Sequence, residues 1–365
     1  MRELAIVQPY VPQYRVPFFE GLSHALQADG VTLRVIAGTP TGAQQARADA
    51  AQADWLETVT PRGLDIGSRH LSLTYSRSLW RNADAVIVPH QGTSLDAVSA
   101  LAYRGSRRVG VWGHIAPYTS PLNVIDGAIE RWQLRRAHHV FAYMPGGANF
   151  ARRAGVESSR ITTIMNSIDS ADLESELTHQ SAASARESLR ARGVPDGRYL
   201  AYVGGLDESK RIAFLARALD VLHDRNSNVH LVVLGSGEQS GTLGPAAARG
   251  QVTLLGYGGT ADKASVLLGA EAVVNPGRIG LIAVDCLASR TPLITTEWPW
   301  HAPEVEYLTR GVHMHVAAND VDAFADAMDR GASGALAPAD EAWPAPPTIQ
   351  AMVQNFRSGV RRLLR

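Results

Sequence analysis

The sequence predicts an α/β protein made of two doubly wound domains, each built around a parallel sheet. Strand-length apolar runs alternate with helical patterns along most of the 365 residues, and strands connected through helices pair in parallel. A chain of this length also suits two domains. Residues 171–196 are the most polar interior stretch and lack strand-like runs. We therefore expect domains at 1–170 and 197–347, with a linker region at 171–196.

The first series of strands opens with "ELAIVQ" at 3–8. A helical segment at 17–30 follows and ends at Gly30, a residue type that commonly caps helix C-termini. Four further strand-like runs are expected in this domain, at 31–38, 84–90, 107–114 and 138–145, before a last short run at 161–165. The alternation predicts a parallel sheet covered by helices.

The second series has six strand-like runs, at 198–205, 228–237, 251–257, 270–277, 291–297 and 311–317, and most of them end in Gly or are closely followed by Gly or Pro. The tail at 349–365 places Met352, Phe356, Val360 and Leu364 at helical spacing. We expect a C-terminal helix at 348–365 that packs back on the first domain. Two such domains in series predict a ligand site at the carboxyl ends of their strands, between the domains.

Composition narrows the function classes. The chain has 35 basic and 35 acidic residues, which disfavours a dedicated nucleic-acid binder. A single cysteine, Cys286, excludes an internal disulfide framework and fits a reducing compartment. The N-terminus shows no signal-peptide pattern, and no apolar run approaches the ~20 residues that span a bilayer. We expect a soluble, cytoplasmic protein in which Cys286 packs as a small apolar residue.

Two cations follow a strand that ends at Gly204 and Gly205. We expect a helix to begin near Ser209, with Lys210 and Arg211 in its first turn. The helix dipole disfavours cations there by ~0.3–1 kcal/mol, so the pair makes sense if an anion lies in front of it. The alternative interpretation is a basic first turn exposed to solvent.

The stretch "NPGRIGLIAVDCLASRTPLIT" at 275–295 reads as a glycine turn between a strand and a helix. Backbone N–H groups near Gly280 and Leu281 are candidates for binding a diphosphate, since the first N–H groups of a helix lack partners within it. Asp285, on the helix, is a candidate acceptor for ribose hydroxyls or an ordinary surface residue. The whole stretch also fits plain α/β architecture with nothing bound.

Histidines occupy two strand ends in the first domain. His114 follows the strand that closes at Gly113, and His90 holds a similar place. Both lie on the side where such sheets bind ligands, although a lone histidine is more often structural. For metals, no cluster of His, Cys, Asp or Glu has ligand spacing, so we expect no metal site.

A long Pro- and Tyr-rich turn follows the first strand, at 8–19. It fits either an acceptor-contacting lip or a rigid loop that anchors two core phenylalanines. Tyr10, Tyr14 and Arg15 are the candidate acceptor-side residues.

In this order, the motifs resemble retaining GT-B glycosyltransferases of the large family that includes bacterial cell-surface and phospholipid-linked mannosyl- and glucosyltransferases. The matching stretches, spread over nearly the whole chain, are "PYVPQYRVPFFEGL", "VWGHIAPY", "TTIMNSID", "YVGGLDESKRIAFLARAL", "LVVLGSGE", "NPGRIGLIAVDCLASRTPLITT" and "HAPEVEYL".

The resemblance implies two Rossmann-like domains that face a central cleft. The second domain is implied to bind a UDP- or GDP-sugar, whose sugar passes with retained configuration to a glycan, lipid-linked or small-molecule acceptor. No metal or other cofactor is implied, because basic side chains and helix N-termini stabilise the leaving diphosphate. Carried over by motif, Lys210 binds the diphosphate, Gly280 and Leu281 supply N–H groups, Asp285 holds ribose, His114 contacts the donor sugar, and Gly256 and Tyr257 lie near the base.

Two positions depart from the family pattern. The usual phosphate-binding arginine falls on Gly205, so Arg211 is the candidate substitute. The first glutamate of the long motif, which commonly contacts the donor sugar in relatives, falls on Gly277. Arg278, beside that gap, is a candidate contact for a phosphate or an anionic sugar.

Two other interpretations stay open. One is a GT-B protein that binds a nucleotide-sugar without catalysis, which the missing glutamate suggests. The other is a different two-lobed enzyme, such as a sugar-nucleotide epimerase or an NAD-linked oxidoreductase. Basic stretches at 103–110, 130–139 and 150–155 also suggest peripheral contact with an anionic membrane, although they equally fit solvated arginines.

Overall fold

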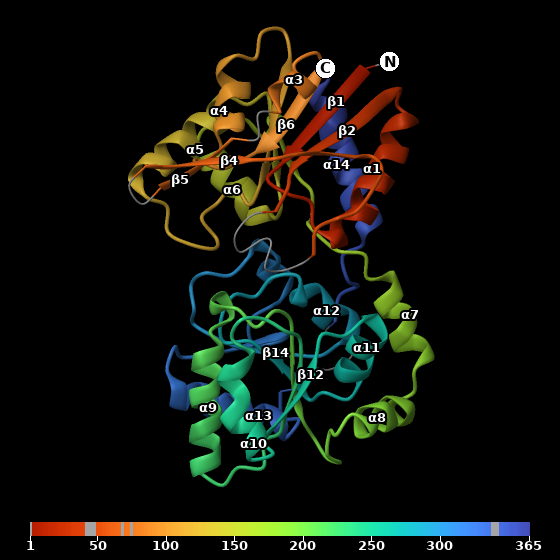
Figure 1. Cartoon of the computed structure of the whole chain (residues 1–365), viewed down its shortest axis with the longest axis vertical. Helices are drawn as coiled ribbons and strands as arrows, with labels where there is room; N and C mark the ends of the chain where they lie inside the picture. The colour runs from red at the N-terminus through yellow and green to blue at the C-terminus, as the bar shows by residue number, and fades with distance from the viewer. Residues whose placement is uncertain (1, 41–48, 67–68, 74–75, 337–342) are drawn as a thin grey trace. The chain divides into compact units, whose positions relative to one another are not determined.

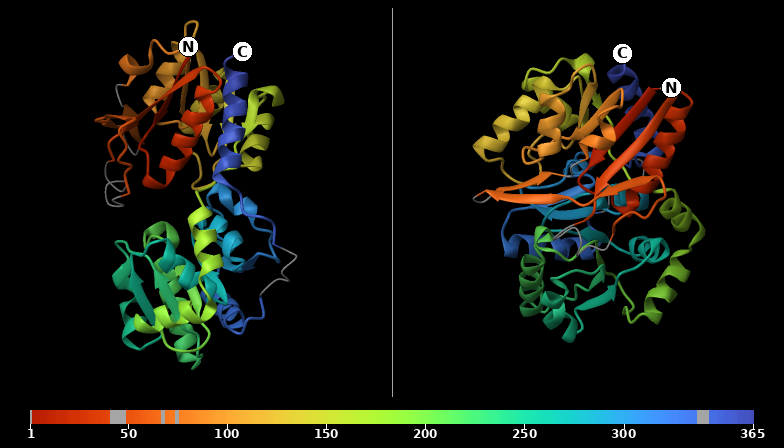
Figure 2. Two further views of the ribbon diagram at one scale, coloured as in Figure 1. Left: turned by 90° about the vertical axis from the view of Figure 1, so that its right-hand side faces the viewer. Right: turned by 45° about the horizontal axis from the view of Figure 1, so that its top comes forward.

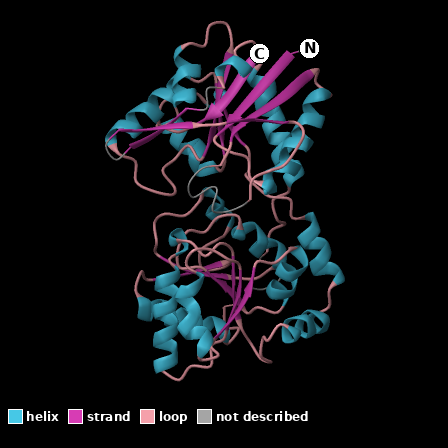
Figure 3. Cartoon of the chain, in the orientation of Figure 1, coloured by secondary structure: helices cyan, strands magenta, loops and turns pink. Residues whose placement is uncertain are grey.

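The computed structural model describes residues 2–40, 49–66, 69–73, 76–336 and 343–365. The chain divides into two compact units, residues 1–169 with 347–365 (unit 1) and residues 170–346 (unit 2). Each unit is an α/β domain in which helices cover a parallel sheet, which confirms the predicted fold class (Figure 3).

Unit 1 contains a seven-stranded sheet in the order β3-β2-β1-β6-β7-β8-β9. All six pairings in it are parallel. The order runs outward from β1 in one direction and from β6 in the other, so the switch point lies between these two strands. The strands are β1 Arg2–Gln8, β2 Val31–Gly38, β3 Leu56–Val59, β6 Ala85–Pro89, β7 Arg108–Gly113, β8 His139–Ala142 and β9 Ile161–Thr163.

An antiparallel pair, β4 Arg62–Ile66 with β5 Arg69–Leu73, lies apart from this sheet. The helices of unit 1 are α1 Val16–Gln27, α3 Arg77–Trp80, α4 Leu95–Ala102, α5 Val124–Arg136, α6 Pro145–Arg153 and α14 Ile349–Leu363. Neither β3 nor the β4–β5 pair was among the predicted strands, because their sequences are short and rich in polar residues.

The C-terminal helix α14 lies beside α1 in unit 1 (Figures 1 and 2). Phe356 of α14 packs against Phe18 of α1, with ring centroids 5.4 Å apart, and stacks on Phe141 of β8 at 4.5 Å. Outside this core, Asp29 accepts hydrogen bonds from Arg357 and Arg361. These two guanidinium groups hold the pKa of Asp29 well below its usual range. Apolar packing and ion pairing therefore both fix the chain's last helix to unit 1.

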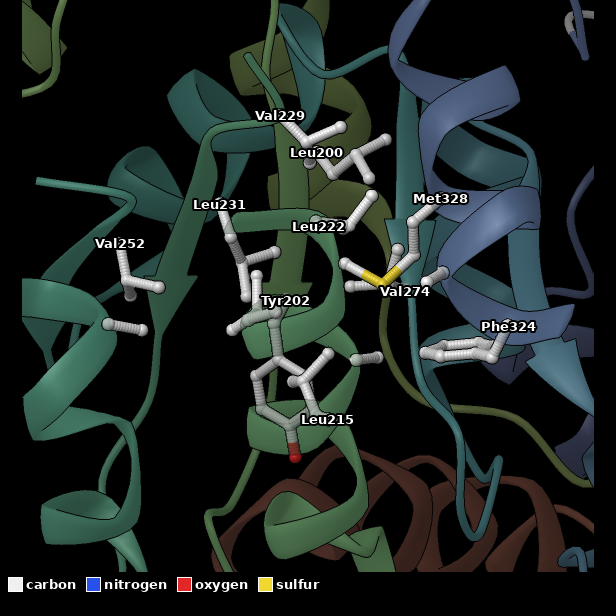
Figure 4. Close-up of a cluster of buried hydrophobic side chains, with 14 of the residues drawn as sticks. Leu200, Tyr202, Leu215, Leu222, Val229, Leu231, Val252, Val274, Phe324 and Met328 are labelled. Atoms are coloured by element: carbon white, nitrogen blue, oxygen red, sulfur yellow. The ribbon is translucent and has the colours of Figure 1, made fainter. Parts of the chain in front are cut away.

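Unit 2 contains a six-stranded parallel sheet in the order β12-β11-β10-β13-β14-β15. Its strands are β10 Leu200–Val203, β11 Leu231–Leu234, β12 Val252–Gly256, β13 Ala272–Val274, β14 Leu293–Thr296 and β15 Met314–Ala317. Its helices are α7 Ala171–His179, α8 Ala182–Ala191, α9 Ile212–Asp224, α10 Gly244–Ala248, α11 Thr260–Leu268, α12 Ile282–Ser289 and α13 Val321–Ala332. Side chains such as Leu215, Leu231 and Phe324 fill the space between one sheet face and its helices (Figure 4).

Residues 171–196 are not the linker that the sequence suggested. They form α7 and α8, which pack on α11 within unit 2. Leu173 and Leu189 are buried there in one apolar cluster with Leu267, and Gln180 Nε2 donates to Ser265 Oγ at 2.8 Å. The helices bury few apolar residues each, so their sequences look polar although they belong to the domain.

Candidate functional site

Two loops at the carboxyl edge of the unit 2 sheet carry most of the predicted donor-site residues. The first, 204–211, follows β10, and the second, 275–281, joins β13 to α12. Because β10 and β13 are neighbours, their loops emerge side by side. We call residues 204–211 and 275–281 the loop pair.

The backbone of the loop pair is cross-linked by hydrogen bonds. The Arg278 N–H donates to Ser209 O at 2.8 Å, and Lys210 Nζ donates to Arg278 O at 2.5 Å. Asn275 supports the second loop from inside, since its Oδ1 accepts from the Gly277 N–H and its Nδ2 donates to Arg278 O. Lys210 and Arg278, far apart in sequence, are therefore brought into contact through the Arg278 backbone, and their binding of an anion stays a prediction.

Gly277 is the point of closest approach between the two loops. A Cβ atom at this position would lie 2.5 Å from Ser209 O and 2.8 Å from Lys210 Cα. Such distances are far shorter than ordinary contacts, so any larger residue here, including glutamate, would push the loops apart. The departure from the family motif at Gly277 is thus built into how this loop pair packs.

Lys210 and Arg211 do not lie in the first turn of a helix, as the sequence had suggested. Glu208–Lys210 form a short 3-10 turn, and α9 begins only at Ile212. Arg211 caps α9 with left-handed backbone geometry, at φ 57°. The chain therefore turns sharply at Arg211, and the Lys210 and Arg211 side chains contact different partners.

Arg211 braces the loop pair to the rest of unit 2. One nitrogen, Nη1, donates to Pro276 O, Thr296 Oγ1 and Asn319 Oδ1 at 2.8–3.0 Å. The guanidinium also lies over the rings of Phe214 and Trp298, at 4.0 and 4.6 Å from their centroids. Its predicted substitution for the family's phosphate arginine stays a prediction, because these contacts already give it a structural role.

His301 supports the second loop and was not among the predicted site residues. Its Nδ1 accepts a hydrogen bond from the Ile279 N–H at 3.2 Å, and the Ala302 N–H donates to Ile279 O at 2.7 Å. Burial and the nearby Lys210 ammonium lower the pKa of His301 to about 4. The histidine is therefore neutral at pH 7, and its place at the start of "HAPEVEYL" was the signal in the sequence.

Gly280 and Leu281 lead directly into α12, which begins at Ile282. Both are partly accessible, and N–H groups at this point of a helix have no partner within it. Asp285, in the first turn, is buried and pairs with Lys263 Nζ at 3.1 Å. Burial raises the pKa of Asp285, while Lys263 opposes that rise. Asp285 is thus not the ordinary surface residue of the alternative interpretation, and its ribose role stays a prediction.

The predicted base-side and strand-end residues lie along the same sheet edge. Gly204 and Gly256 have positive φ, 140° and 70°, at the ends of β10 and β12. Gly205 O accepts from the Tyr202 hydroxyl at 2.6 Å, and Tyr257 is 85% exposed. The structure thus gathers these residues on one edge and leaves the Tyr257 ring open to a ligand.

Unit 1 has a cavity of about 590 Å³ at the carboxyl ends of β6 and β7. This volume is typical of small-molecule sites. Six residues that give the cavity its chemistry are His90, Gly92, His114, Asp126, Glu130 and Tyr143. None of the described residues that line it is a lysine or an arginine. We call this cavity the unit 1 pocket.

His114 lies in this pocket, as the strand-end position predicted. Its ring is 5.1 Å from that of Tyr143 and 6.2 Å from that of Tyr118, in edge-to-face arrangements. Gly147 allows the His114 backbone to come close, because a Cβ there would lie 2.4 Å from His114 O. The histidine is thus held between aromatic rings and a neighbouring backbone.

Glu130 and His90 stabilise the wall of the pocket through hydrogen bonds. Glu130 Oε1 accepts from the Gly92 N–H at 3.0 Å, and His90 Nε2 contacts Glu130 O at 3.2 Å. Burial raises the pKa of Glu130 and lowers that of His90 to about 4. His90 is therefore a neutral, structural histidine, and Glu130 fixes the loop after β6.

The predicted acceptor lip borders a second cavity of about 250 Å³ in unit 1, which Tyr10, Tyr14 and Arg15 help to line. Tyr14 is 43% exposed, whereas Arg15 is only 5% exposed. Arg15 Nη2 donates to Asn166 Oδ1 at 2.7 Å, and its guanidinium lies over Trp112 and Tyr143. These buried contacts of Arg15 fit the alternative interpretation of a rigid loop, and its acceptor role stays a prediction.

Two protein-family models match the chain. "Glycosyltransferase Family 4" matches residues 18–172, and "Glycosyl transferases group 1" matches residues 197–333. The chain is a glycosyltransferase. Together the two matches cover most of the sequence. No curated protein sequence matches the chain significantly.

Solved structures show that this glycosyltransferase has the GT-B fold. Anabaena HepE in complex with UDP is 14% identical, with a TM-score of 0.66 and coverage of 99% of this chain and 100% of HepE. A glycosyltransferase from Rickettsia africae is 12% identical, with a TM-score of 0.67 and coverage of 99% and 98%. A UDP-GlcNAc 2-epimerase from Methanocaldococcus jannaschii is also similar, at 11% identity, a TM-score of 0.59 and coverage of 99% and 100%.

Among the described residues, no group of three or more His, Cys, Asp or Glu side chains is placed to hold a metal ion. In the loop pair, Lys210 and Arg211 contact backbone carbonyl groups, whereas in the unit 1 pocket the Glu130 backbone contacts the neutral His90.

Proposed function

We propose that this glycosyltransferase takes a sugar from a UDP-sugar bound at the loop pair and transfers it to a hydroxyl group of an acceptor, with retained configuration and without a metal. The observation that carries the proposal is the cross-linked loop pair, which places Lys210 and Arg278 beside the start of α12. UDP as the leaving group is supported by HepE, whose structures include complexes with UDP and with UDP-glucose.

The leaving diphosphate would develop negative charge as the glycosidic bond breaks. Lys210 supplies a positive charge, and the N–H groups of Gly280 and Leu281 supply unpaired donors at the N-terminus of α12. Arg278 O holds the Lys210 ammonium in place beforehand, and the bond from the Arg278 N–H to Ser209 O fixes the two loops against each other, so little reorganisation is needed during the reaction. The proposal thus assigns to the chain's own residues the stabilisation that a metal ion provides in other enzymes.

The unit 1 pocket is the proposed acceptor and sugar site. Its aromatic rings suit stacking with a sugar ring, and its carboxylates and His114 are hydrogen-bond partners for hydroxyl groups. The absence of lysine and arginine among the described lining residues disfavours an acceptor that presents a phosphate there. We infer that a polyhydroxylated, uncharged part of the acceptor enters this pocket, and that His114 contacts the transferred sugar.

One alternative has specific support. The fold is shared with UDP-GlcNAc 2-epimerases, and Gly277 replaces the glutamate that contacts the sugar in related transferases. An epimerase would convert its UDP-sugar without an acceptor, whereas a transferase releases UDP only when an acceptor is present. A sugar-nucleotide panel, analysed by ion-pair chromatography with and without glycan acceptors, separates these outcomes. Acceptor-independent formation of an epimer would overturn the proposal.

A thermal-shift panel of UDP, GDP and dTDP tests the donor directly. A nucleotide at about 100 times its dissociation constant stabilises the protein by roughly 2.7 kcal/mol, which such an assay detects. A shift with GDP but not with UDP would redirect the donor proposal while leaving the loop pair as the site.

The reducing, cytoplasmic setting expected from the sequence is consistent with the single, buried Cys286.

A further inference from the structure

Helix α5 of unit 1 has its polar and apolar faces reversed relative to an ordinary surface helix. Its exposed side includes Val124, Ile125 and Trp132, with 85%, 57% and 37% of their surface accessible. Its buried side includes Asp126 and Gln133, at 9% and 0%. A helix on a globular domain normally turns its apolar stripe to the core and its charged residues to water.

The inward polar side chains of α5 build the wall of the unit 1 pocket. Gln133 Nε2 donates to Gln91 O at 2.9 Å, and Glu130 accepts from the Gly92 N–H. Asn123 Oδ1 caps the helix by accepting from the Asp126 N–H at 2.8 Å. The reversal is therefore specified by hydrogen bonds to the pocket loop. The apolar residues are left outside because the polar ones are needed inside.

The charges on the outward side of α5 are all positive. Arg131, Arg135 and Arg136 are exposed, whereas the helix's acids, Asp126 and Glu130, turn toward the pocket. Apolar side chains flanked by arginines, with no exposed acid, are the composition of helices that lie on anionic lipid headgroups. We call Leu122, Val124, Ile125, Arg131 and Trp132 the α5 face.

We propose that the α5 face docks on an anionic lipid surface. Leu122, which is 37% exposed, belongs to both the α5 face and the rim of the unit 1 pocket. Docking therefore brings the pocket to the headgroup layer, where a lipid-linked saccharide presents its sugar. Assigning the pocket to the acceptor rests on the proposed function, but the docking itself does not. Among the described residues, no helix is long and apolar enough to cross a bilayer, so the contact is peripheral.

A second copy of the chain fits the α5 face less well. In a twofold contact the same patch meets itself, which would bring arginines of the two copies together without acids to neutralise them. Anionic headgroups supply the missing negative charge. Of the arginines, Arg135 and Arg136 also donate through Nε to Ala154 O and Leu101 O, which holds their stems along the protein surface.

Of the basic stretches first considered for membrane contact, 130–139 includes Arg131, Arg135 and Arg136 of α5, whereas 103–110 lies outside this helix. In the 103–110 stretch, Arg104 Nη1 donates to Arg136 O at 2.7 Å and Arg107 donates to Arg81 O. These arginines are thus engaged with backbone carbonyl groups of unit 1. The apolar residues of the α5 face, which charge counting missed, carry the proposal.

Co-sedimentation of the full chain with sucrose-loaded vesicles tests the docking. One set of vesicles contains phosphatidylcholine alone, and the other contains phosphatidylcholine with about one third phosphatidylglycerol. We expect binding only to the anionic vesicles. The double variant Val124→Asp/Ile125→Asp should bind at least about tenfold more weakly. Leu254→Asp, at a residue of unit 2 that is 41% exposed, is the matched control and should bind like the parent.

Three results would overturn the proposal: no binding of the parent to anionic vesicles, equal binding of the double variant, or a concentration-dependent dimer that the double variant abolishes. The substituted side chains are exposed, so unfolding temperatures should match the parent and guard against a folding artefact. UDP-induced thermal shifts report on unit 2 separately. If UDP fails to bind while vesicle binding still depends on Val124 and Ile125, the docking stands and the proposed donor falls.

Discussion

The loop pair of unit 2 and the unit 1 pocket both lie at the carboxyl ends of parallel strands, yet they are built in opposite ways. The loop pair is closed, and backbone groups hold it together, with Gly277 packed against Lys210. The pocket is an open cavity of about 590 Å³ whose wall consists of side chains such as His114 and Glu130.

This contrast matches the chemistry of the two proposed ligands. A diphosphate is small and highly charged, so fixed N–H groups and a lysine at short range bind it well. A saccharide is larger and neutral, and it is recognised by many directional hydrogen bonds and by aromatic surface. The carboxyl edge of a parallel sheet can therefore bind either a diphosphate or a saccharide, depending on whether glycine or bulky polar residues follow its strands.

Removing the charge from the loop pair should have the largest effect. Lys210→Ala takes away both the positive charge and the hydrogen bond to Arg278 O. We expect transfer to fall by about 10²–10³-fold, since preorganised electrostatic contacts have this weight, and the UDP-induced thermal shift to disappear. Steady-state release of UDP and the thermal shift measure the two effects. Arg217→Ala, an exposed cation on α9, is the matched control and should change neither.

A substitution in the unit 1 pocket should lower the rate of transfer without weakening the binding of UDP. His114→Ala leaves the loop pair intact, so we expect an unchanged thermal shift with UDP but a rate of transfer lower by about 10²-fold. A matched variant, Gln91→Ala, alters a neighbouring pocket residue and should lower the rate far less. Weaker UDP binding in His114→Ala, measured by calorimetry, would contradict the separation of the two sites.

Closure of the loop pair can be tested through a single Cβ atom. Gly277→Ala would place that atom 2.5 Å from Ser209 O, so we expect a loss of about 1–3 kcal/mol in the free energy of unfolding. Gly280→Ala is the control, because its nearest neighbour would be Ala302 Cβ at 3.8 Å, an ordinary contact. Urea unfolding of both variants gives the comparison. Equal stabilities would mean that the loops are not packed as described.

Much of the fold was predictable, because local patterns determine it. The apolar runs around β1, β10 and β11 identified strands, and the spacing of Met352 and Phe356 identified the last helix. The exceptions were elements with few apolar residues. The β4–β5 pair escaped notice, and α7 and α8 resembled a linker because each buries only one or two residues.

The sequence predicted which residues belong to each candidate site, but not the contacts that hold them in place. Lys210 and His114 were found because they follow strands in recognisable motifs. Gly277 is required because Ser209, which is distant in the sequence, leaves no room for a side chain there. His301 supports the loop by accepting a hydrogen bond from the Ile279 N–H. The contacts of Arg211 with Trp298 and Pro276, which give it a structural role, come from segments that are distant from it in the sequence. Such contacts depend on the tertiary structure, and one sequence alone does not reveal them.

The smallest expected effect concerns the pH response of the loop pair. His301 has a folded-state pKa of about 4, below its ordinary value of 6.5, so the unfolded chain binds its proton first as the pH falls. Its contribution to stability is therefore complete above pH 6.5 and is lost progressively between pH 6.5 and 4. At pH 5 we expect this histidine to account for a loss of about 1–2 kcal/mol relative to pH 7.

His301→Asn isolates this contribution, because an amide oxygen still accepts from the Ile279 N–H but does not titrate. Its unfolding free energy should fall less steeply than that of the parent between pH 7 and 5. The carboxyl group of Asp29 does not interfere, since its arginine partners keep its pKa far below this window. His90→Asn is the comparison from the pocket, where burial also lowers the pKa to about 4. If both variants flatten the profile but only His301→Asn changes the pH dependence of UDP binding, the acid sensitivity of the donor site arises from the loop pair. Identical pH profiles of UDP binding in His301→Asn and the parent would show instead that this histidine supports the fold without acting on the donor site.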